Sequence, residues 1–130
     1  MKPLLHTLAP VLYVKNIYDS LDFYCDVLGF ERPFIWGDPP GFAMPKREHI
    51  IIMLSQTSDS SKIQPKKDIW DVYVWVSDVK FLHNEFKSKG ANFSQDLILK
   101  EHYGNLEFIV EDPDGYSIAF AEGVTKDSFF

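Results

Sequence analysis

Residues 71–90, DVYVWVSDVKFLHNEFKSKG, contain the pattern that decides the fold. The first six residues alternate, with valines on one side of an expected strand and an acid and two aromatics on the other. Ser77 or Asp78 is placed to cap a helix with an apolar stripe, and Gly90 follows where glycine commonly ends a helix. The segment therefore predicts a strand, a short turn and an amphipathic helix.

The same pattern occurs earlier, in residues 9–29, APVLYVKNIYDSLDFYCDVLG. Val14 and Val76 are 62 positions apart, and Gly29 and Gly90 are 61 apart. Two copies of one strand–helix unit indicate a duplicated supersecondary structure, because a solenoid needs more repeats. We therefore predict an α+β fold in which two βαβββ repeats form a cleft-shaped mixed sheet.

We expect the whole chain, residues 1–130, to form one domain. Half 1 is placed at about residues 7–55 and half 2 at about 70–122, with a polar linker at about 56–69. In the first helix, the apolar stripe consists of Ile17, Leu21, Tyr24 and Leu28. Strands are expected at residues 8–14, 30–36, 42–45, 50–54, 71–76, 106–110 and 116–121.

Charge and composition restrict the function classes. The formal net charge is −6 and Lys66-Lys67 is only a short basic cluster, so we expect no nucleic-acid partner. An acidic surface attracts cationic ligands or merely aids solubility.

Cys25 is the single cysteine and is expected to be an inert, buried or half-buried thiol. No apolar run approaches ~20 residues, so we expect no membrane span and a cytoplasmic protein.

A ligand site is predicted on the face that carries the acid and aromatics of residues 71–76. On that face Ala119 and Ala121 make room, whereas Trp70 is expected only to anchor the linker. Aromatic faces and carboxylates suit a planar or cationic small molecule, although Phe34 and Phe42 fit a core role equally well. The residues expected to line the site are Phe34, Trp36, Phe42, Asp71, Tyr73, Trp75, Tyr103 and Glu107.

Two regions carry a family resemblance. The first contains PVLYVKN (10–16), SLDFY (20–24) and VLGF (27–30), and the second is FIVEDPDGY (108–116). They resemble the opening and closing segments of glyoxalase I, bleomycin resistance protein and extradiol dioxygenase relatives, the vicinal oxygen chelate superfamily. The resemblance covers nearly the whole chain and implies a fold more than an activity.

The resemblance also implies where a metal would bind. The ligand positions of metal-dependent relatives fall at Ala9, Asp71 and Ala119, and the fourth falls in strand 50–54, which has no ligating side chain. One carboxylate does not make a divalent site, so we expect no metal and no cofactor. Of the histidines, His83 is expected to face solvent.

The missing ligands favour the bleomycin-resistance branch, whose members bind an antibiotic without chemistry. In that branch a first-strand proline, here Pro10, implies a homodimer with N-terminal strand exchange. The alternative is a glyoxalase-like lyase, an isomerase or a dioxygenase-type enzyme, for which Glu107 and His102 are weak candidates as base and acid. A structural or regulatory module without a ligand is a third interpretation.

Overall fold

A computed structural model of the protein describes residues 2–126 and 128. The chain separates into two compact units, unit 1 at Met1–Ile63 and unit 2 at Gln64–Phe130. The boundary lies inside the polar segment 56–69 that the sequence marks as a linker.

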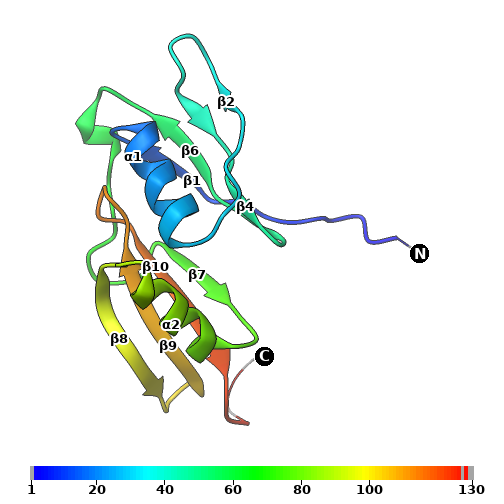
Figure 1. Ribbon diagram of the computed structural model, residues 1–130. Coiled ribbons are helices and arrows are strands. Elements are labelled where there is room, and N and C mark those ends of the chain that lie inside the picture. Colours follow the sequence, from blue (N-terminus) through cyan, green and yellow to red (C-terminus); the bar gives the residue numbers. More distant parts are fainter. Residues whose placement is uncertain (1, 127, 129–130) are drawn as a thin grey trace. The chain divides into compact units, whose positions relative to one another are not determined.

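Unit 1 contains one helical segment and a four-stranded mixed sheet (Figure 1). The strand order is β1-β6-β3-β2, in which β1 and β6 are parallel and the other neighbours are antiparallel. Strands β4 and β5 form a separate small hairpin. The elements are β1 (Val11–Val14), α1 (Ile17–Leu21), the π-helix η1 (Asp22–Val27), β2 (Ile35–Trp36), β3 (Phe42–Ala43), β4 (Lys46–Arg47), β5 (Ile50–Ile51), β6 (Met53–Gln56) and the 3-10 helix η2 (Ser60–Lys62).

The apolar stripe of the first helical segment forms the core of unit 1. All four predicted stripe residues, Ile17, Leu21, Tyr24 and Leu28, are buried. The side chain of Asn16 accepts hydrogen bonds from two backbone N–H groups at the start of α1 and so caps this helix. Gly29 ends the segment at φ 76°, a conformation that side chains with a Cβ rarely adopt.

Three of the expected strands in unit 1 are shorter than predicted, those at 8–14, 30–36 and 42–45, and the one at 50–54 is divided between β5 and β6. β1 begins at Val11 rather than at residue 8, because Pro10 has no N–H to donate to the sheet. Of residues 30–36, only Ile35 and Trp36 form a strand, together with an isolated bridge at Glu31. Pro33 interrupts this stretch for the same reason.

Unit 2 repeats the topology of unit 1 with longer strands (Figure 1). The order β7-β10-β9-β8 again places the first and last strands side by side and parallel. The α+β fold with two βαβββ repeats is therefore confirmed. The elements are β7 (Val72–Trp75), α2 (Val79–Ser88), β8 (Phe93–Lys100), β9 (Asn105–Glu111) and β10 (Ser117–Gly123).

Helix α2 covers one face of the unit 2 sheet. The ring of Phe86 lies edge-on to Phe108 at 5.8 Å and to Phe120 at 5.1 Å. Phe108 and Phe120 are themselves stacked, and all three rings are buried. Burial of aromatic rings is a large stabilising contribution, so this face is the core of unit 2 and the opposite face is left for a site.

The expected exposure of His83 is wrong. Only 13% of its side chain is exposed, and its ring lies 5.0 Å from that of Phe93 and 5.4 Å from that of Phe108. Its Nε2 also lies 2.6 Å from a carboxylate oxygen of Asp96. Residues of β8 cover the ring, in contacts outside the helix that helical periodicity does not reveal.

None of the helices in the described part of the chain is long and apolar enough to span a bilayer.

Candidate functional site

The face of the unit 2 sheet opposite α2 presents the residues that alternation predicted. Tyr73 pairs with Ala119, which pairs in turn with Ile109, and the next row holds Trp75, Ala121 and Glu107. The two alanines are fully buried. Because their side chains are single methyl groups, the sheet has room above its central strand.

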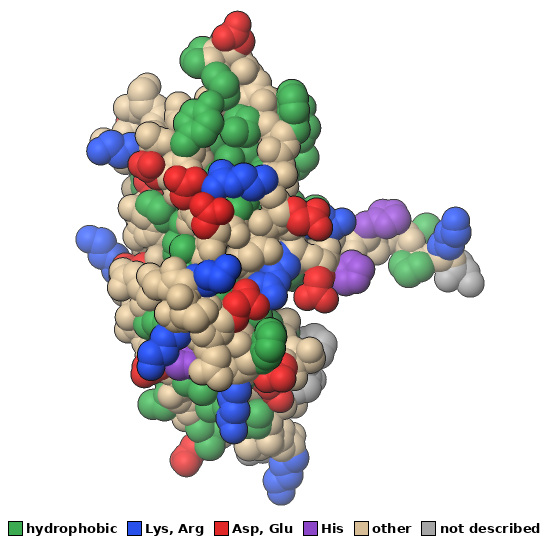
Figure 2. Space-filling view, in the orientation of Figure 1, with side chains coloured by type: hydrophobic (Ala, Val, Ile, Leu, Met, Phe, Trp, Pro, Cys, Tyr) green, Lys and Arg blue, Asp and Glu red, His purple; other side chains and the backbone are tan. Residues whose placement is uncertain are grey.

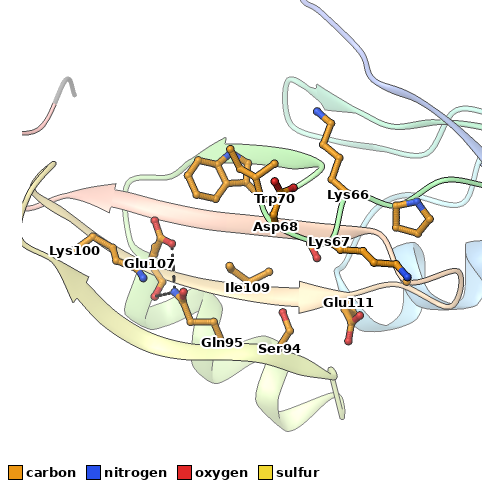
Figure 3. A pocket seen from close by; sticks show the side chains of 14 residues that line it. Lys66, Lys67, Asp68, Trp70, Ser94, Gln95, Lys100, Glu107, Ile109 and Glu111 are labelled. Atoms are coloured by element: carbon orange, nitrogen blue, oxygen red, sulfur yellow. Dashed lines mark hydrogen bonds between the residues drawn. The ribbon is translucent and has the colours of Figure 1, made fainter.

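A cavity of about 640 Å³ lies on this face (Figure 3). Residues of β8, β9 and β10 form the floor of the cavity, and the loop of residues 65–70 forms its wall. A cavity of this size suits a small organic molecule. The lining residues are Pro65, Lys66, Lys67, Asp68, Ile69, Trp70, Ser94, Gln95, Lys100, Glu107, Ile109, Glu111, Gly115 and Ser117.

Glu107 is a buried carboxylate at the floor of the cavity. Its Oε1 accepts a hydrogen bond of 2.9 Å from the hydroxyl of Tyr73 and one of 2.6 Å from the hydroxyl of Tyr103. Its Oε2 lies 3.3 Å from the side-chain amide of Gln95, which donates to it. The side chain is 0% exposed, so these donors stabilise it in place of water.

The two tyrosines are held in their neutral, donating form. Burial, the largest cause, raises the pKa of Tyr73 to about 12, with Glu107 adding to the rise and a hydrogen bond from Asn105 opposing it. Burial and the Glu107 carboxylate also raise the pKa of Tyr103. Both hydroxyl groups therefore remain donors to Glu107 at neutral pH.

The position of Gln95 depends on an irregularity in β8. The pairing of β8 with β9 shifts on both sides of Gln95, between Phe93 and Gln95 and again between Gln95 and Ile98. Bulges of this kind redirect a side chain. Here the Gln95 amide reaches both the carboxylate and the backbone carbonyl of Glu107.

Asp71 fixes the loop that forms the cavity wall. Its Oδ1 accepts a hydrogen bond of 2.8 Å from the backbone N–H of Lys66, and its Oδ2 accepts one of 2.9 Å from the backbone N–H of Ser117. Both carboxylate oxygens are therefore used to tie residues 65–70 to β10.

The residues predicted for the site fall into separate groups. Glu107 lines the cavity, and Tyr73, Tyr103 and Asp71 support it through hydrogen bonds. Trp75 is 37% exposed, and its ring lies 5.4 Å from that of Tyr73, on the same face.

In unit 1, Phe34, Trp36 and Phe42 form an aromatic cluster. The Trp36 ring lies 5.3 Å from that of Phe34 and 6.0 Å from that of Phe42. Phe34 is 69% exposed, so it does not belong to the core.

His102 is exposed in the turn between β8 and β9, where its ring packs edge-on against Tyr103. Cys25 is buried, and desolvation is the main cause that raises the pKa of its thiol. It therefore stays protonated, as expected of an inert cysteine.

Several cavity residues were not identified from sequence. Trp70 lines the cavity, with its ring 4.7 Å from that of Tyr73, rather than serving only as a linker anchor. Lys100 pairs with Asn105 and so lies on the same face as Glu107. Strand alternation in β8 could have identified Lys100 had the register with β9 been known, whereas the contribution of the 65–70 loop has no local signal.

Comparison with known families identifies the fold. Residues 4–120 match the sequence-family model of the Glyoxalase/Bleomycin resistance protein/Dioxygenase superfamily. The chain belongs to this superfamily.

Solved structures of the superfamily fold have the same arrangement. TioX from Micromonospora sp. ML1 is 21% identical with a TM-score of 0.74, covering 91% of this chain and 98% of its own. TnmS3, an antibiotic binding protein from Streptomyces sp. CB03234, is 14% identical with a TM-score of 0.72. The match covers 95% of this chain and 99% of TnmS3.

Curated superfamily relatives carry an enzyme name. A probable lactoylglutathione lyase from Synechocystis sp. is 26% identical, over 95% of this chain and 97% of its own length. A lactoylglutathione lyase from Neisseria meningitidis is 28% identical, over 95% of this chain and 93% of its own length.

The side chains at the superfamily's metal positions do not fit a divalent ion. Ala9 and Ala119 have no donor atom, and both oxygens of Asp71 accept backbone hydrogen bonds. Within residues 2–126 and 128, no three His, Cys, Asp or Glu side chains are grouped so as to hold a metal. Such a site needs three or four converging ligands, which these side chains do not supply.

Proposed function

We propose that this protein binds a flat aromatic small molecule in the unit 2 cavity, without a metal of its own and without chemical change. The observation that carries the proposal is the cavity of about 640 Å³ beside Trp70, built over a sheet whose metal-ligand position is the buried methyl group of Ala119. The similarity to an antibiotic binding protein supports the same function.

The physical basis is stacking. Trp70 and Ile109 give the cavity an aromatic wall and an apolar floor (Figure 3). Aromatic rings stack on indole with an energy of ~0.5–1.5 kcal/mol beyond the area they bury. Asp71 holds the loop that carries Trp70, so the wall is formed before a ligand arrives.

Tryptophan fluorescence tests this proposal. Titration with planar aromatic compounds, including antibiotics, should quench emission in the intact protein, and Trp70→Phe should remove most of the quenching. Trp36→Phe, a change in unit 1, is the matched control and should leave the quenching in place. Quenching that survives Trp70→Phe would place the ligand elsewhere.

An enzyme of the lactoylglutathione lyase type is the second candidate, favoured by the names of the curated relatives. Metal analysis of protein purified without chelator separates the two candidates. The binding proposal expects well under one metal ion per chain and no turnover of lactoylglutathione after addition of Zn²⁺ or Ni²⁺. Stoichiometric tight metal or metal-dependent turnover would favour the enzyme.

We also propose that the partner of the protein is a second copy of this chain. Residues 2–8 form an exposed arm that extends from the unit 1 sheet (Figure 1). Leu4, Leu5 and Leu8 are 88%, 89% and 85% exposed on this arm. Exposed leucines this close together on one segment are typical of a surface that packs against another subunit.

A further inference from the structure

We infer that the ligand is a flat aromatic anion, such as an aromatic carboxylate or phenolate, whose charged oxygen binds Lys100. The inference rests on the proposed binding function and concerns the chemistry at one end of the unit 2 cavity. It differs from the cationic ligand that the net charge of −6 suggests.

The carboxylates that favoured a cation are used within the protein. Asp71 accepts two backbone hydrogen bonds, and Glu107 accepts from two tyrosine hydroxyls and an amide. Glu107 exposes none of its surface, so its oxygens are not open to a ligand in this structure. Asp71 is not among the residues that line the cavity, and Glu107 is fully buried, so neither carboxylate is presented to an incoming cation.

The groups that remain at this end of the cavity are donors. Lys100 lies at the end of β8 on the cavity face, and Figure 3 shows its side chain extending inward toward Glu107 and Gln95. Among the described residues, its ammonium group makes no ion pair within 4.0 Å. The amide of Gln95 holds Glu107 through long contacts of 3.3 and 3.5 Å, and it can donate to a ligand as well.

The other acidic residues of the cavity lie apart from this end. Glu111 is four positions further along β9, which places it about 13 Å from Glu107 in an extended strand. Asp68 belongs to the exposed 65–70 loop, and Figure 3 shows it beside Trp70 rather than beside Lys100. A ring stacked on Trp70 above Ile109 can therefore direct an anionic oxygen to Lys100 without facing a free carboxylate.

The charges outside the cavity do not determine whether it binds an anion or a cation. Figure 2 shows acidic and basic side chains interspersed over the visible face of each unit, so the net negative charge is not gathered there into a single patch. The charge of the groups inside the cavity affects ligand binding more than the net charge of the chain does. Exposed charges more than ~10 Å away are screened by salt.

Isothermal titration calorimetry with three isosteric probes tests the inference. The probes are 2-naphthoate, 2-naphthamide and 2-naphthylmethylammonium at pH 7.5. We expect 2-naphthoate to bind about five-fold more tightly than the neutral amide, with an affinity that falls as salt rises. Lys100→Met should remove that advantage and leave the amide's affinity within about two-fold, whereas Lys100→Arg should retain it.

Lys80→Met is the matched control, because Lys80 lies on α2, which packs on the other face of the sheet. It should leave all three affinities unchanged. Stronger binding of the ammonium probe, or naphthoate binding that is indifferent to Lys100→Met, overturns the anion inference while leaving the binding function intact. Failure of all three probes to bind the folded protein contradicts the proposed function itself.

Discussion

The hydroxyl of Tyr103 donates a hydrogen bond of 2.6 Å to Oε1 of Glu107, four residues further along the chain. Tyr73 donates to the same oxygen from the other edge of the sheet, across β10. One buried carboxylate thus connects β7, β9 and the turn at residues 101–104, and it forms part of the cavity floor.

Tyr103→Phe should lower the free energy of unfolding by about 1–3 kcal/mol, because it removes a donor from a buried carboxylate. Urea denaturation followed by circular dichroism measures the change. Tyr18→Phe is the control, since Tyr18 is 53% exposed and its hydroxyl makes no hydrogen bond with the described residues. Equal effects of the two substitutions would contradict a stabilising role for the Tyr103–Glu107 bond.

The stability of the protein should fall at alkaline pH. The pKa of Tyr73 rises from 10.0 in the unfolded chain to about 12 in the folded protein, so its contribution is complete below pH 10. It is lost as the pH rises from about 10 to about 12, because only the unfolded state then releases the proton.

Urea midpoints measured between pH 8 and 11.5 test this dependence. Tyr73→Phe should flatten the decline, whereas Tyr18→Phe should not. A decline that is equally steep in Tyr73→Phe would assign the alkaline transition to other groups.

Asp71→Asn should destabilise the protein by about 1–2 kcal/mol, because an amide can replace only one of the two acceptors. It should also speed hydrogen exchange at the backbone N–H groups of Lys66 and Ser117, which Asp71 now binds. The measurement is hydrogen exchange by NMR, and Asp68→Asn is the control on the same loop. Unchanged protection of both amides would contradict the role of Asp71 as the anchor of the cavity wall.

The proposed dimer predicts a mass of twice the chain's 15.0 kDa by light scattering at micromolar concentration. Replacing Leu4, Leu5 and Leu8 with serine should shift the protein toward monomer, because the exposed apolar surface of the arm is removed. Leu99→Ser, at a leucine that is 40% exposed in unit 2, is the control. A monomer in the unsubstituted protein would refute the strand-exchanged arrangement.

Much of the architecture follows from local pattern. Alternation in residues 71–76 separated Val72 and Val74 from Tyr73, and the stripe from Ile17 to Leu28 marked the core of unit 1. These patterns are readable because strand and helix periods are fixed by backbone geometry. Exceptions arose at Pro10 and Pro33, where a missing N–H shortened the expected strands.

The sequence by itself determined the duplicated βαβββ fold, the superfamily and the absence of donor atoms at Ala9 and Ala119, since these depend on residue type and spacing. Tertiary structure alone decided how the charges are used. From the sequence, Glu107 was expected to be an acid available to a ligand, but Tyr73 of β7 and Gln95 of β8 donate hydrogen bonds to it. The register of β8 with β9 brings Lys100 to the same face, and the 65–70 loop brings Trp70 over it. Such contacts join residues up to 46 positions apart, as Asp71 and Ser117 are, and no local pattern encodes them.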